Sequence, residues 1–448
     1  MKFEKRSSMP VSAQELFNWH GRPGAFARLC PPWQEMEVVK EDPGLAKGKR
    51  IELKMSTPIG KRTWHALHTE CDAGLGFTDV QEKGPFKSWK HRHRFEPTGD
   101  GQCDLVDEIE FELPLGGLGE SVARGELEKG FAYRHWITRR DQVLRQSIPR
   151  FETLKVAIVG GSGFLGTQLR ALLEAQGHDV FIVTRNKRSE SDIRWDPAAG
   201  EIELARLEGL DAVVHLAGEN LTSGRWTEER KKRLWSSRVD ATTFLVEALG
   251  RLERPPSVLL SGSGIGIYGS DPEAVFSEDS PRGEGFLAEL CEAWEAAAAR
   301  AESLDTRVCL LRTGVVIDPR GGALPKMLPA FRLGAGGPLG SGEQWFPWIG
   351  LEDWIGAVNW LLFAKNASGP VNLVAPQVVR QKDFARALGQ ALKRPAFLPA
   401  PRFALSALLG EMADEALLSS IHAKPGVLES VGYSFVLPDL RALFSKVI

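Results

Sequence analysis

A glycine-rich segment at residues 160–166 has the composition and spacing of a phosphate-binding loop. It reads Gly160-Gly161-Ser162-Gly163-Phe164-Leu165-Gly166. The segment follows the apolar run at 155–159 directly and opens a helix-length amphipathic stretch, which is the context that such a loop requires. Gly160 then permits the tight turn, Gly163 lets backbone N–H groups approach a pyrophosphate, and Gly166 allows the helix to pack closely. An ordinary glycine turn is the alternative.

The residues after the next apolar run, 179–183, select between the two nicotinamide dinucleotides. An Asp or Glu at this place would accept hydrogen bonds from both ribose hydroxyls of NAD. This chain has Thr184 and Arg185 instead, and a guanidinium pairs well with a 2′-phosphate. We therefore expect NADP as the cofactor. The alternative is that Arg185 is a solvated loop charge.

Strands and helices alternate after residue 150. Nearly all-apolar runs rich in β-branched residues lie at 155–159, 179–183, 211–216, 257–262 and 307–311. Helix-length amphipathic segments lie between them at Phe164–Gln176, Glu228–Leu249 and Phe286–Ser303. Strands that are buried on both faces of a parallel sheet have this composition. The pattern predicts an α/β fold with a doubly wound parallel sheet.

The first 150 residues follow another pattern. Short runs of alternating polarity lie at Glu37–Lys40, Lys49–Ser56, Arg62–Cys71, Gly76–Glu82, Ser88–Glu96 and Cys103–Leu113. A helix at Ser12–His20, with Ser12 as its N-cap, precedes them, and a long helix at about 119–146 follows. The pattern predicts an α+β domain with a meandering antiparallel sheet, joined to the next domain by a linker at Ser147–Glu152.

Composition and charge exclude several classes of protein. Hydrophobic residues make up 43% and charged residues 25% of the 448, and the formal net charge is −2. This balance gives no reason to expect nucleic-acid or membrane partners. Five widely spaced cysteines without a CxxC pair argue against disulfides and structural zinc. With neither an apolar span of membrane length nor a secretory signal, we expect a cytoplasmic protein.

The order of motifs after residue 154 resembles an atypical extended short-chain dehydrogenase/reductase, of the epimerase-like branch known as the NAD-dependent epimerase/dehydratase or sugar nucleotide epimerase family. The motifs are GGSGFLG (160–166), WDPAAGEI (195–202), LAGEN (216–220), RWTEERKKRLWSSRVDAT (225–242), SGSGIGIYG (261–269), LRTGVVIDPRGGALPKMLPAF (311–331) and VNLVAP (371–376). The resemblance implies an NADP-binding Rossmann domain at 154–398. It also implies a small C-terminal cap domain at 399–448, where LGEMADEALL matches.

The first 150 residues resemble the START-like helix-grip fold, also called SRPBCC or polyketide cyclase/dehydrase. The resemblance lies in WHGRPGAFARLCPPW, FTDVQEKGPFKSWKHRHRF and FAYRH. In that fold a curved sheet wraps the long C-terminal helix and encloses an apolar cavity. The resemblance therefore implies a ligand-binding domain at 1–150 that takes an apolar small molecule.

The resemblance to the epimerase-like branch also assigns cofactor contacts. The pyrophosphate would lie against Gly160, Gly163, Phe164, Leu165 and Gly166, and the adenosine phosphate against Thr184 and Arg185. The middle of the cofactor would be lined by Leu216, Ala217, Gly218 and Glu219, with Arg238 on the same side. The nicotinamide would lie near Ser261, Ser263 and Arg312.

The Tyr-x-x-x-Lys pair that does acid–base chemistry in ordinary members is missing. None of the three tyrosines has a lysine four residues later, and the two expected positions hold Phe286 and Leu290. Ser263 and Tyr268 are the candidate catalytic residues that are left. Replacement acids or bases among the carboxylates are Glu219, Glu278, Asp279, Glu343 and Asp353, although solvated or capping roles are the more common ones for such groups.

Three functions stay open at this point. The first is an NADP(H)-dependent oxidoreductase or epimerase acting on an unidentified small molecule, such as a nucleotide sugar or an apolar ligand of the first domain. The second is a non-catalytic NADP(H) sensor or scaffold, and the third is a ligand carrier. The sequence leaves the oligomeric state open, although extended reductases often form homodimers through the helices equivalent to 228–249 and 286–303.

Histidines are concentrated in the first domain, at positions 65, 68, 91, 93 and 135. In a strand, His91 and His93 would face the same side, where they could ligate a metal ion. The sequence shows no third ligand at metal spacing, and the family resemblance implies none. We therefore expect no metal and interpret these residues as polar groups of a sheet face or cavity wall.

Overall fold

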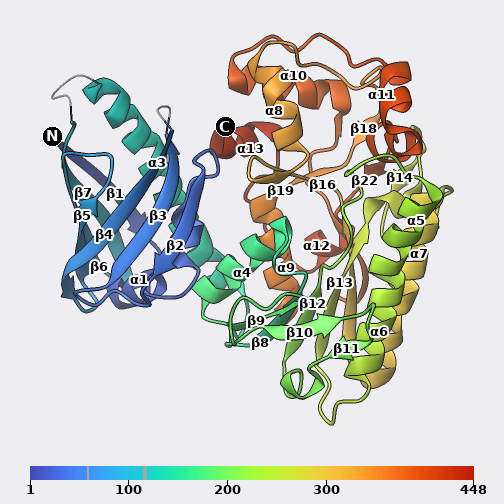
Figure 1. The fold of residues 1–448 in the computed structure, drawn as a ribbon, viewed down its shortest axis with the longest axis horizontal. Coiled ribbons are helices and arrows are strands. Elements are labelled where there is room, and N and C mark those ends of the chain that lie inside the picture. The colour runs from blue at the N-terminus through green and yellow to red at the C-terminus, as the bar shows by residue number, and fades with distance from the viewer. Residues whose placement is uncertain (58–59, 115–118) are drawn as a thin grey trace. The chain divides into compact units, whose positions relative to one another are not determined.

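The structure, a computed structural model, describes residues 1–57, 60–114 and 119–448. It consists of two compact units, which are coloured by residue number in Figure 1. The first unit comprises Met1–Thr153 and Arg170–His178, and the second comprises Leu154–Leu169 and Asp179–Ile448.

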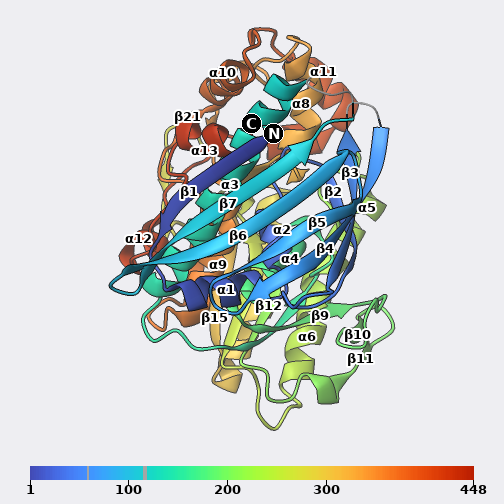
Figure 2. The same ribbon diagram turned by 90° about the vertical axis from the view of Figure 1, so that its left-hand side faces the viewer.

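The first unit is built on an antiparallel sheet with the strand order β1-β7-β6-β5-β4-β3-β2, seen face-on in Figure 2. Its strands are β1 (Lys2–Met9), β2 (Met36–Glu41), β3 (Arg50–Thr57), β4 (Gly60–Asp72), β5 (Gly76–Lys83), β6 (Ser88–Gly99) and β7 (Gln102–Glu112). Its helices are α1 (Ala13–His20), α2 (Ala25–Leu29) and α3 (Glu120–Ser147). Phe131 of α3 packs with Phe3, Trp89 and Phe111 of the sheet, so the long helix covers one sheet face.

Most of this unit follows the sequence prediction. All six predicted strands are present, and the Ser12 hydroxyl caps α1 by accepting a hydrogen bond from the N–H of Glu15. Strand β1 and the short helix α2 were not predicted. The eight residues of β1 carry several exposed charges, and the strand forms because it pairs along its whole length with β7. Helix α2 is held by a buried two-point ion pair between Arg28 and Asp141 of α3.

The second unit is built on a doubly wound sheet with the order β11-β10-β9-β8-β12-β13-β15-β20. The strands are β8 (Lys155–Val159), β9 (Asp179–Thr184), β10 (Ile193–Asp196), β11 (Glu201–Ile202), β12 (Ala212–His215), β13 (Val258–Gly264), β15 (Arg307–Thr313) and β20 (Gly369–Leu373). Neighbours from β10 to β20 run parallel, and only β11 pairs antiparallel. This is the predicted Rossmann-type fold class.

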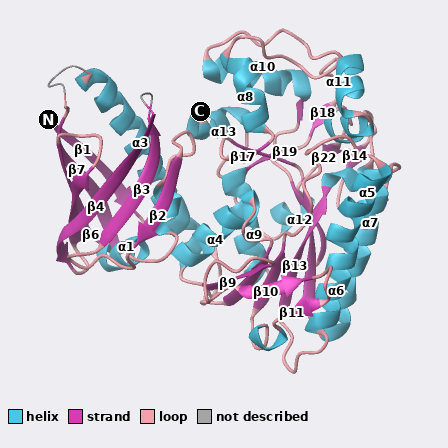
Figure 3. Cartoon of the chain, in the orientation of Figure 1, coloured by secondary structure: helices cyan, strands magenta, loops and turns pink. Residues whose placement is uncertain are grey.

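The helices of the second unit are drawn in cyan in Figure 3. They are α4 (Phe164–Gln176, of which the last part belongs to the first unit), α5 (Glu228–Trp235), α6 (Ala241–Leu249), α7 (Phe286–Ala299), α8 (Leu324–Arg332), α9 (Leu351–Phe363), α10 (Gln381–Leu392), α11 (Arg402–Leu409), α12 (Gly426–Ser430) and α13 (Leu440–Val447). Small strands complete it: β14 (Val275–Phe276), β16 (Val315–Asp318), β17 (Gly321–Gly322), β18 (Trp345–Phe346), β19 (Trp348–Gly350), β21 (Val379–Arg380) and β22 (His422–Ala423).

The core of the second unit explains why its strands are apolar throughout. One cluster joins Val159 of β8, Val213 of β12, Leu259 of β13 and Leu245 of α6, each fully buried. Side chains on both faces of these strands lie under helices, so neither face needs polar residues. In the part of the chain that the structure describes, no helix is long and apolar enough to cross a bilayer.

The C-terminal residues join the second unit through a strand. Val275 and Phe276 of β14 pair in parallel with His422 and Ala423 of β22. The phenol of Tyr433 and the backbone N–H groups of Val436 and Leu437 contact Asp353 of α9. Asp353, one of the carboxylates considered for catalysis, is therefore engaged in anchoring the C-terminal segment.

The exposed Gly125 in α3 gives a prediction about the first unit. A Cβ at Gly125 would meet no atom within 4 Å, so Gly125→Ala should add only helix propensity. We expect the free energy of unfolding to rise by about 0.5–1 kcal/mol, measured by urea denaturation followed by circular dichroism. The contrasting variant is Gly119→Ala, which should destabilise because Gly119 precedes the same helix with φ of 89°. Equal effects of the two substitutions would contradict this account.

Candidate functional site

The glycine-rich loop between β8 and α4 fits against the end of β12 so closely that its glycines are required. Gly160 has φ of 83°, and a Cβ there would lie 2.8 Å from the backbone nitrogen of Ala217. A Cβ at Gly166 would lie 2.6 Å from the carbonyl oxygen of Gly160. The N–H of Leu216 donates to the carbonyl of Val159 at 2.8 Å and holds the two strand ends together. The positive φ of Gly160 fits the predicted tight turn, and the close contacts of Gly166 fit the predicted packing of the helix on the strand.

The outer side of the loop is open. Ser162 and Gly163 are exposed, and the nearest atom to a Cβ at Gly163 would be the carbonyl oxygen of Gly160 at 3.3 Å. Helix α4 begins at Phe164, so its positive N-terminal end lies at this open side. The Phe164 ring packs against Gly321, where any Cβ would overlap it. The arrangement leaves room for a phosphate group at the helix N-terminus.

Arg185 lies immediately after β9 and is exposed. Its carbonyl accepts a hydrogen bond from Arg194 Nη1 at 2.9 Å, and the Thr184 hydroxyl accepts one from the N–H of Asn186 at 3.3 Å. Among the described residues the Arg185 guanidinium makes no hydrogen bond or ion pair, whereas Lys187 is paired with Glu203 at 3.1 Å. Arg185 is therefore an exposed cation, directly at this strand end, that is available to a phosphate.

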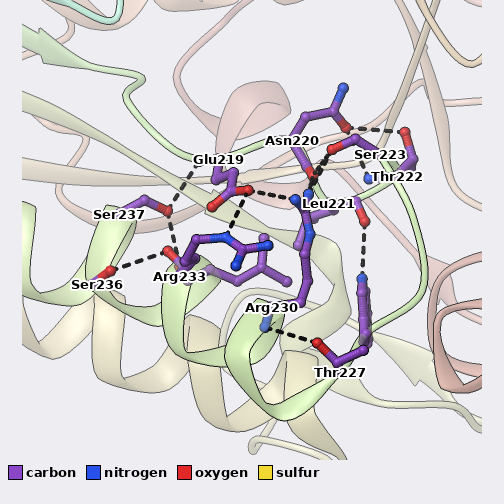
Figure 4. A network of polar contacts seen from close by, with 12 residues as sticks. Glu219, Asn220, Leu221, Thr222, Ser223, Thr227, Arg230, Arg233, Ser236 and Ser237 are labelled. Atoms are coloured by element: carbon purple, nitrogen blue, oxygen red, sulfur yellow. Dashed lines mark hydrogen bonds and ion pairs between the residues drawn. The ribbon is translucent and has the colours of Figure 1, made fainter.

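Glu219, at the end of the β12 segment, is held in a network of polar contacts (Figure 4). Its carboxylate is paired with Arg230 and, at 3.4 Å, with Arg233. Its backbone N–H donates to the Ser237 hydroxyl at 3.0 Å. Arg230 also donates to the carbonyl of Asn220. Because two guanidinium groups occupy its carboxylate, Glu219 fixes the shape of this loop and is poorly placed to serve as a replacement base.

Arg238 supports the same loop from inside. It lies in a π-helical turn, Ser236–Asp240, between α5 and α6, and turns of this kind often occur at functional sites. Its Nη2 donates to the carbonyl of Glu219 at 2.9 Å, and its guanidinium lies over the Trp294 ring. A Cβ at Gly218 would lie 3.1 Å from it. Burial lowers the pKa of Arg238 to about 10, which leaves it charged at neutral pH.

A buried ion pair between β15 and α7 lies at the end of β13. Arg312 donates to both carboxylate oxygens of Glu295, at 2.8 and 2.9 Å, and the Ser263 hydroxyl donates to the same carboxylate at 2.6 Å. Ser263 and Arg312 are paired in register across the two strands. Ser261, two residues earlier, is fully buried. The structure therefore places Ser263 beside Arg312 and fixes both through Glu295 of α7.

Tyr268 belongs to the same network. Its hydroxyl accepts a hydrogen bond from Arg312 at 2.9 Å and donates one to Asn372 at 2.8 Å, and its ring stacks on Phe276. Only 2% of Tyr268 is exposed, and burial raises the pKa of its phenol although Arg312 opposes this effect. A raised pKa makes proton abstraction by Tyr268 harder. Its catalytic role stays a prediction.

The positions of the missing Tyr and Lys are filled by an apolar cluster. Leu290 of α7 is buried with Trp226, Leu234 and Met412, and Phe286 packs beside them with its ring 5.4 Å from that of Trp226. The backbone N–H of Phe286 donates to the Glu415 carboxylate at 3.0 Å, which caps α7. No proton-transfer group stands at either position.

The other carboxylates that sequence reasoning considered are also engaged or exposed. Glu278 accepts hydrogen bonds from the backbone N–H groups of Asn372 and Val427, at 3.1 and 3.0 Å. Glu343 is paired with Lys382 at the surface, and Asp279 is exposed. Sequence reasoning missed Glu295, because a carboxylate in the middle of α7 gives no sign that it will meet an arginine from β15.

The first unit contains a separate candidate site, a cavity of about 260 Å³. Its apolar lining includes Leu53, Trp64, Phe77, Phe86, Trp89 and Phe131. At one wall stand His91, His93 and Asp79. Burial lowers the pKa of His93, but the carboxylates of Asp107 and Asp79 outweigh burial and raise it to about 9. The wall is thus a charged patch in a cavity that is lined mainly by apolar side chains.

Three known family profiles match separate parts of the chain. Residues 156–374 match the profile of the NAD dependent epimerase/dehydratase family, and residues 400–447 match the Domain of unknown function (DUF1731). Residues 9–130 match the profile of Polyketide cyclase / dehydrase and lipid transport.

Individual relatives extend the comparison. "Epimerase family protein Mb2239" of Mycobacterium bovis is 41% identical over 281 residues, which is 62% of this chain and 93% of that protein. Human "Epimerase family protein SDR39U1" is 38% identical over 298 residues, which is 66% of this chain and 100% of that protein.

Two solved structures are also similar. The nucleoside-diphosphate sugar epimerase of Corynebacterium glutamicum has a TM-score of 0.82 at 29% identity, covering 99% of this chain and 90% of that one. Human SDR39U1, whose structure contains NADPH, has a TM-score of 0.62 at 38% identity, covering 66% of this chain and 99% of that one.

The place of Tyr268 generates a prediction with two readouts. Tyr268→Phe removes the partner of the buried Asn372 oxygen, so we expect the free energy of unfolding to fall by about 1–3 kcal/mol in thermal or urea denaturation. Affinity for NADPH, measured by calorimetry, should stay within a factor of about two. Loss of catalytic turnover without loss of stability would instead assign Tyr268 a role in proton transfer.

Proposed function

The chain belongs to the NAD dependent epimerase/dehydratase family, and from this premise we propose that its second unit binds NADP(H) and performs an epimerase-type oxidation–reduction on a small molecule. The observation that carries the proposal is the pairing of an open glycine loop with the exposed Arg185 at the end of the next strand. A loop of this kind binds a pyrophosphate, and an arginine at that place binds a 2′-phosphate.

The residues present fit this cofactor. Gly160, Gly163 and Gly166, with the N-terminus of α4, would hold the pyrophosphate, because their geometry leaves the outer side of the loop open. Phe164 and Leu165 begin that helix, and Thr184 precedes Arg185 at the adenosine end. The loop that starts at Leu216, Ala217, Gly218 and Glu219 would lie along the middle of the cofactor, supported by Arg238. The presence of NADPH in the human relative supports the assignment.

The protein's part in the chemistry is to orient the reactants. Bound NADP(H) supplies a hydride donor or acceptor. Ser261, Ser263 and Arg312 would stand near the nicotinamide, and the Glu295 carboxylate fixes the Ser263 hydroxyl and the Arg312 guanidinium in place. We propose that Ser263 holds the substrate oxygen, since a serine at this strand end does so in the family that the chain resembles.

The substrate class is the finer part of the proposal. The similar Corynebacterium glutamicum structure is named as a nucleoside-diphosphate sugar epimerase. This name supports testing nucleotide sugars before other hydroxyl or carbonyl compounds. The first unit's cavity supports an apolar small molecule as an additional ligand, independent of the nucleotide.

A second candidate function is NADP(H) binding without turnover, as in a redox-state sensor. The observation that favours it is the apolar cluster around Phe286 and Leu290, because it leaves the usual proton-transfer positions without a titratable group. Cofactor binding is common to both candidates, and turnover separates them.

The cofactor preference is tested by replacing Arg185. Arg185→Ala removes the charge that faces the 2′-phosphate, so calorimetry should show NADPH affinity falling at least about tenfold, which is about 1.4 kcal/mol, while NADH affinity hardly changes. The matched control is Lys187→Ala, because Lys187 is already paired with Glu203. Equal losses of NADPH and NADH affinity in the Arg185 variant would refute the 2′-phosphate assignment.

Turnover is tested with the full chain under NADPH and NADP⁺, by following nicotinamide absorbance with nucleotide sugars and with apolar carbonyl and hydroxyl compounds. We expect turnover of at least one compound, and Ser263→Ala should raise KM more than it lowers kcat. The control is Ser257→Ala, at the opposite end of the same β13 region, which should leave both constants unchanged. Tight NADPH binding with no turnover across the panel would favour the sensor.

A further inference from the structure

The inner face of the sheet in the first unit brings four titratable side chains into one row. Asp79 of β5 stands directly opposite His91 of β6, and His93 of β6 stands directly opposite Asp107 of β7. Residues 91 and 93 are two apart on one strand, so all four side chains point to the same face. The row forms the polar wall of the apolar cavity, because Asp79, His91 and His93 all line it.

Three donor atoms in this row converge on one point. Asp79 Oδ2 lies 3.5 Å from His91 Nδ1 and 3.6 Å from His93 Nε2, and one donor atom from each of the three residues lies within 4.8 Å of the other two. A metal ion that bonds nitrogen and oxygen at about 2.0–2.2 Å in a tetrahedral arrangement holds its ligands about 3.3 Å apart. The two distances to Asp79 are therefore close to the spacing that a bound ion imposes, and an inward movement of the donors would complete the site.

The opposite ring nitrogens of both histidines face a second carboxylate. Asp107 Oδ1 lies 3.0 Å from His91 Nε2 and 2.7 Å from His93 Nδ1. Since a carboxylate only accepts hydrogen bonds, His91 Nε2 carries the proton in its hydrogen bond to Asp107, whereas the contact of His93 Nδ1 is an ion pair without hydrogen-bond geometry. His91 Nδ1, which faces Asp79, is then the nitrogen with the free lone pair, whereas His93 is protonated between the two carboxylates and releases the proton on Nε2 when a metal ion binds. A carboxylate behind each histidine is the arrangement that orients metal-binding imidazoles.

Asp107 is in turn held from the helix side. Its other oxygen, Oδ2, lies 2.7 Å from His135 Nε2 of α3. Asp107, His91 and His135 are each at most 3% exposed, so the support for the ligands is buried and does not depend on surface side chains. Long-range strand pairing and helix packing thus hold the ligands and their supporting carboxylate in one place.

We propose that Asp79, His91 and His93 bind a divalent transition-metal ion, Zn²⁺ or Fe²⁺, with Asp107 orienting both imidazoles. Two imidazoles and one carboxylate are a donor set that suits these ions. Because the three donors supply fewer ligands than either ion takes, the remaining positions face the cavity. A small apolar molecule with a carbonyl, carboxylate or enol oxygen is the class of ligand that would fill the cavity and reach the ion.

The first measurement uses the full-length protein, freed of metal with a chelator. Titration with Zn²⁺ is followed by calorimetry, titration with Co²⁺ by its visible ligand-field absorption, and titration with Fe²⁺ by calorimetry without oxygen. We expect about one ion per chain, with Zn²⁺ displacing Co²⁺. A stoichiometry near zero for all three ions would overturn the proposal and leave the row as a hydrogen-bonded network.

Variants separate this site from adventitious histidine binding. Asp79→Asn removes the negative charge of a ligand and His93→Gln removes an imidazole nitrogen, both with little change in side-chain volume. Loss of the supporting carboxylate in Asp107→Asn should weaken Zn²⁺ binding about 10–100-fold, and each of the two ligand substitutions should weaken it more. The matched control is His65→Gln, because His65 lies on neighbouring β4, is about one-third exposed and stands outside the row. Unchanged Zn²⁺ affinity in Asp79→Asn, or a loss as large in His65→Gln, would contradict the proposal.

If those substitutions unfold the first unit, a further variant tests whether residue 79 is a metal ligand. Asp79→Cys places a thiolate at the proposed ligand position, so the Co²⁺ complex should gain a strong sulfur-to-metal charge-transfer absorption. The same substitution at His65 should not produce it. Binding of NADPH by the second unit, measured in every variant, should remain unchanged and shows that the rest of the protein is intact. Absence of the new absorption in a folded, Co²⁺-loaded Asp79→Cys protein would exclude residue 79 as a ligand.

Discussion

The close approach between the glycine loop and the end of β12 is the constraint on which the candidate nucleotide site depends. A Cβ at Gly160 would lie 2.8 Å from the nitrogen of Ala217, so only glycine lets the two backbones meet. This contact brings the N-terminus of α4 beside the loop that starts at Leu216. Arg230 and Arg238 then hold that loop through Glu219 and its carbonyl. Helix, loop and strand end become one rigid surface because backbone atoms, rather than side chains, make the closest contacts.

Buried polar groups fix the other end of the site. Removing one member of a buried ion pair leaves an uncompensated charge, which is costly, so the Arg312–Glu295 pair commits α7 and β15 to one arrangement. The hydroxyls of Ser263 and Tyr268 belong to the same network, so hydrogen bonds to Glu295 and from Arg312 hold them in place. The same helix α7 carries Phe286 and Leu290 in an apolar cluster. This unit therefore has a buried polar network at the strand ends, whereas apolar side chains occupy the usual proton-transfer positions.

The first unit shows the reverse arrangement, a charged row inside an apolar cavity. Burying carboxylates is unfavourable unless hydrogen bonds or cations compensate them. Asp107 is compensated by three histidines, from β6 and α3. Among the described residues, the ion-pair contacts of Asp79 are the longer ones of 3.5 and 3.6 Å to the two β6 histidines, so it is the less completely compensated of the two. This asymmetry is what makes the space between Asp79, His91 and His93 suited to a cation.

The sequence by itself determined the two fold classes, six strands of the first sheet, the central strands of the second and the glycine loop with Arg185, because periodicity and glycine spacing are local properties of the chain. Tertiary structure alone decided the rest. Strand β1 forms through its pairing with β7. Glu295 is part of the site because it pairs with Arg312, 17 residues away on another element. Asp79 joins His91 and His93 only through strand register. A third ligand on a neighbouring strand gives no recognisable spacing in the sequence, since the register between strands is set by the packing of whole strands.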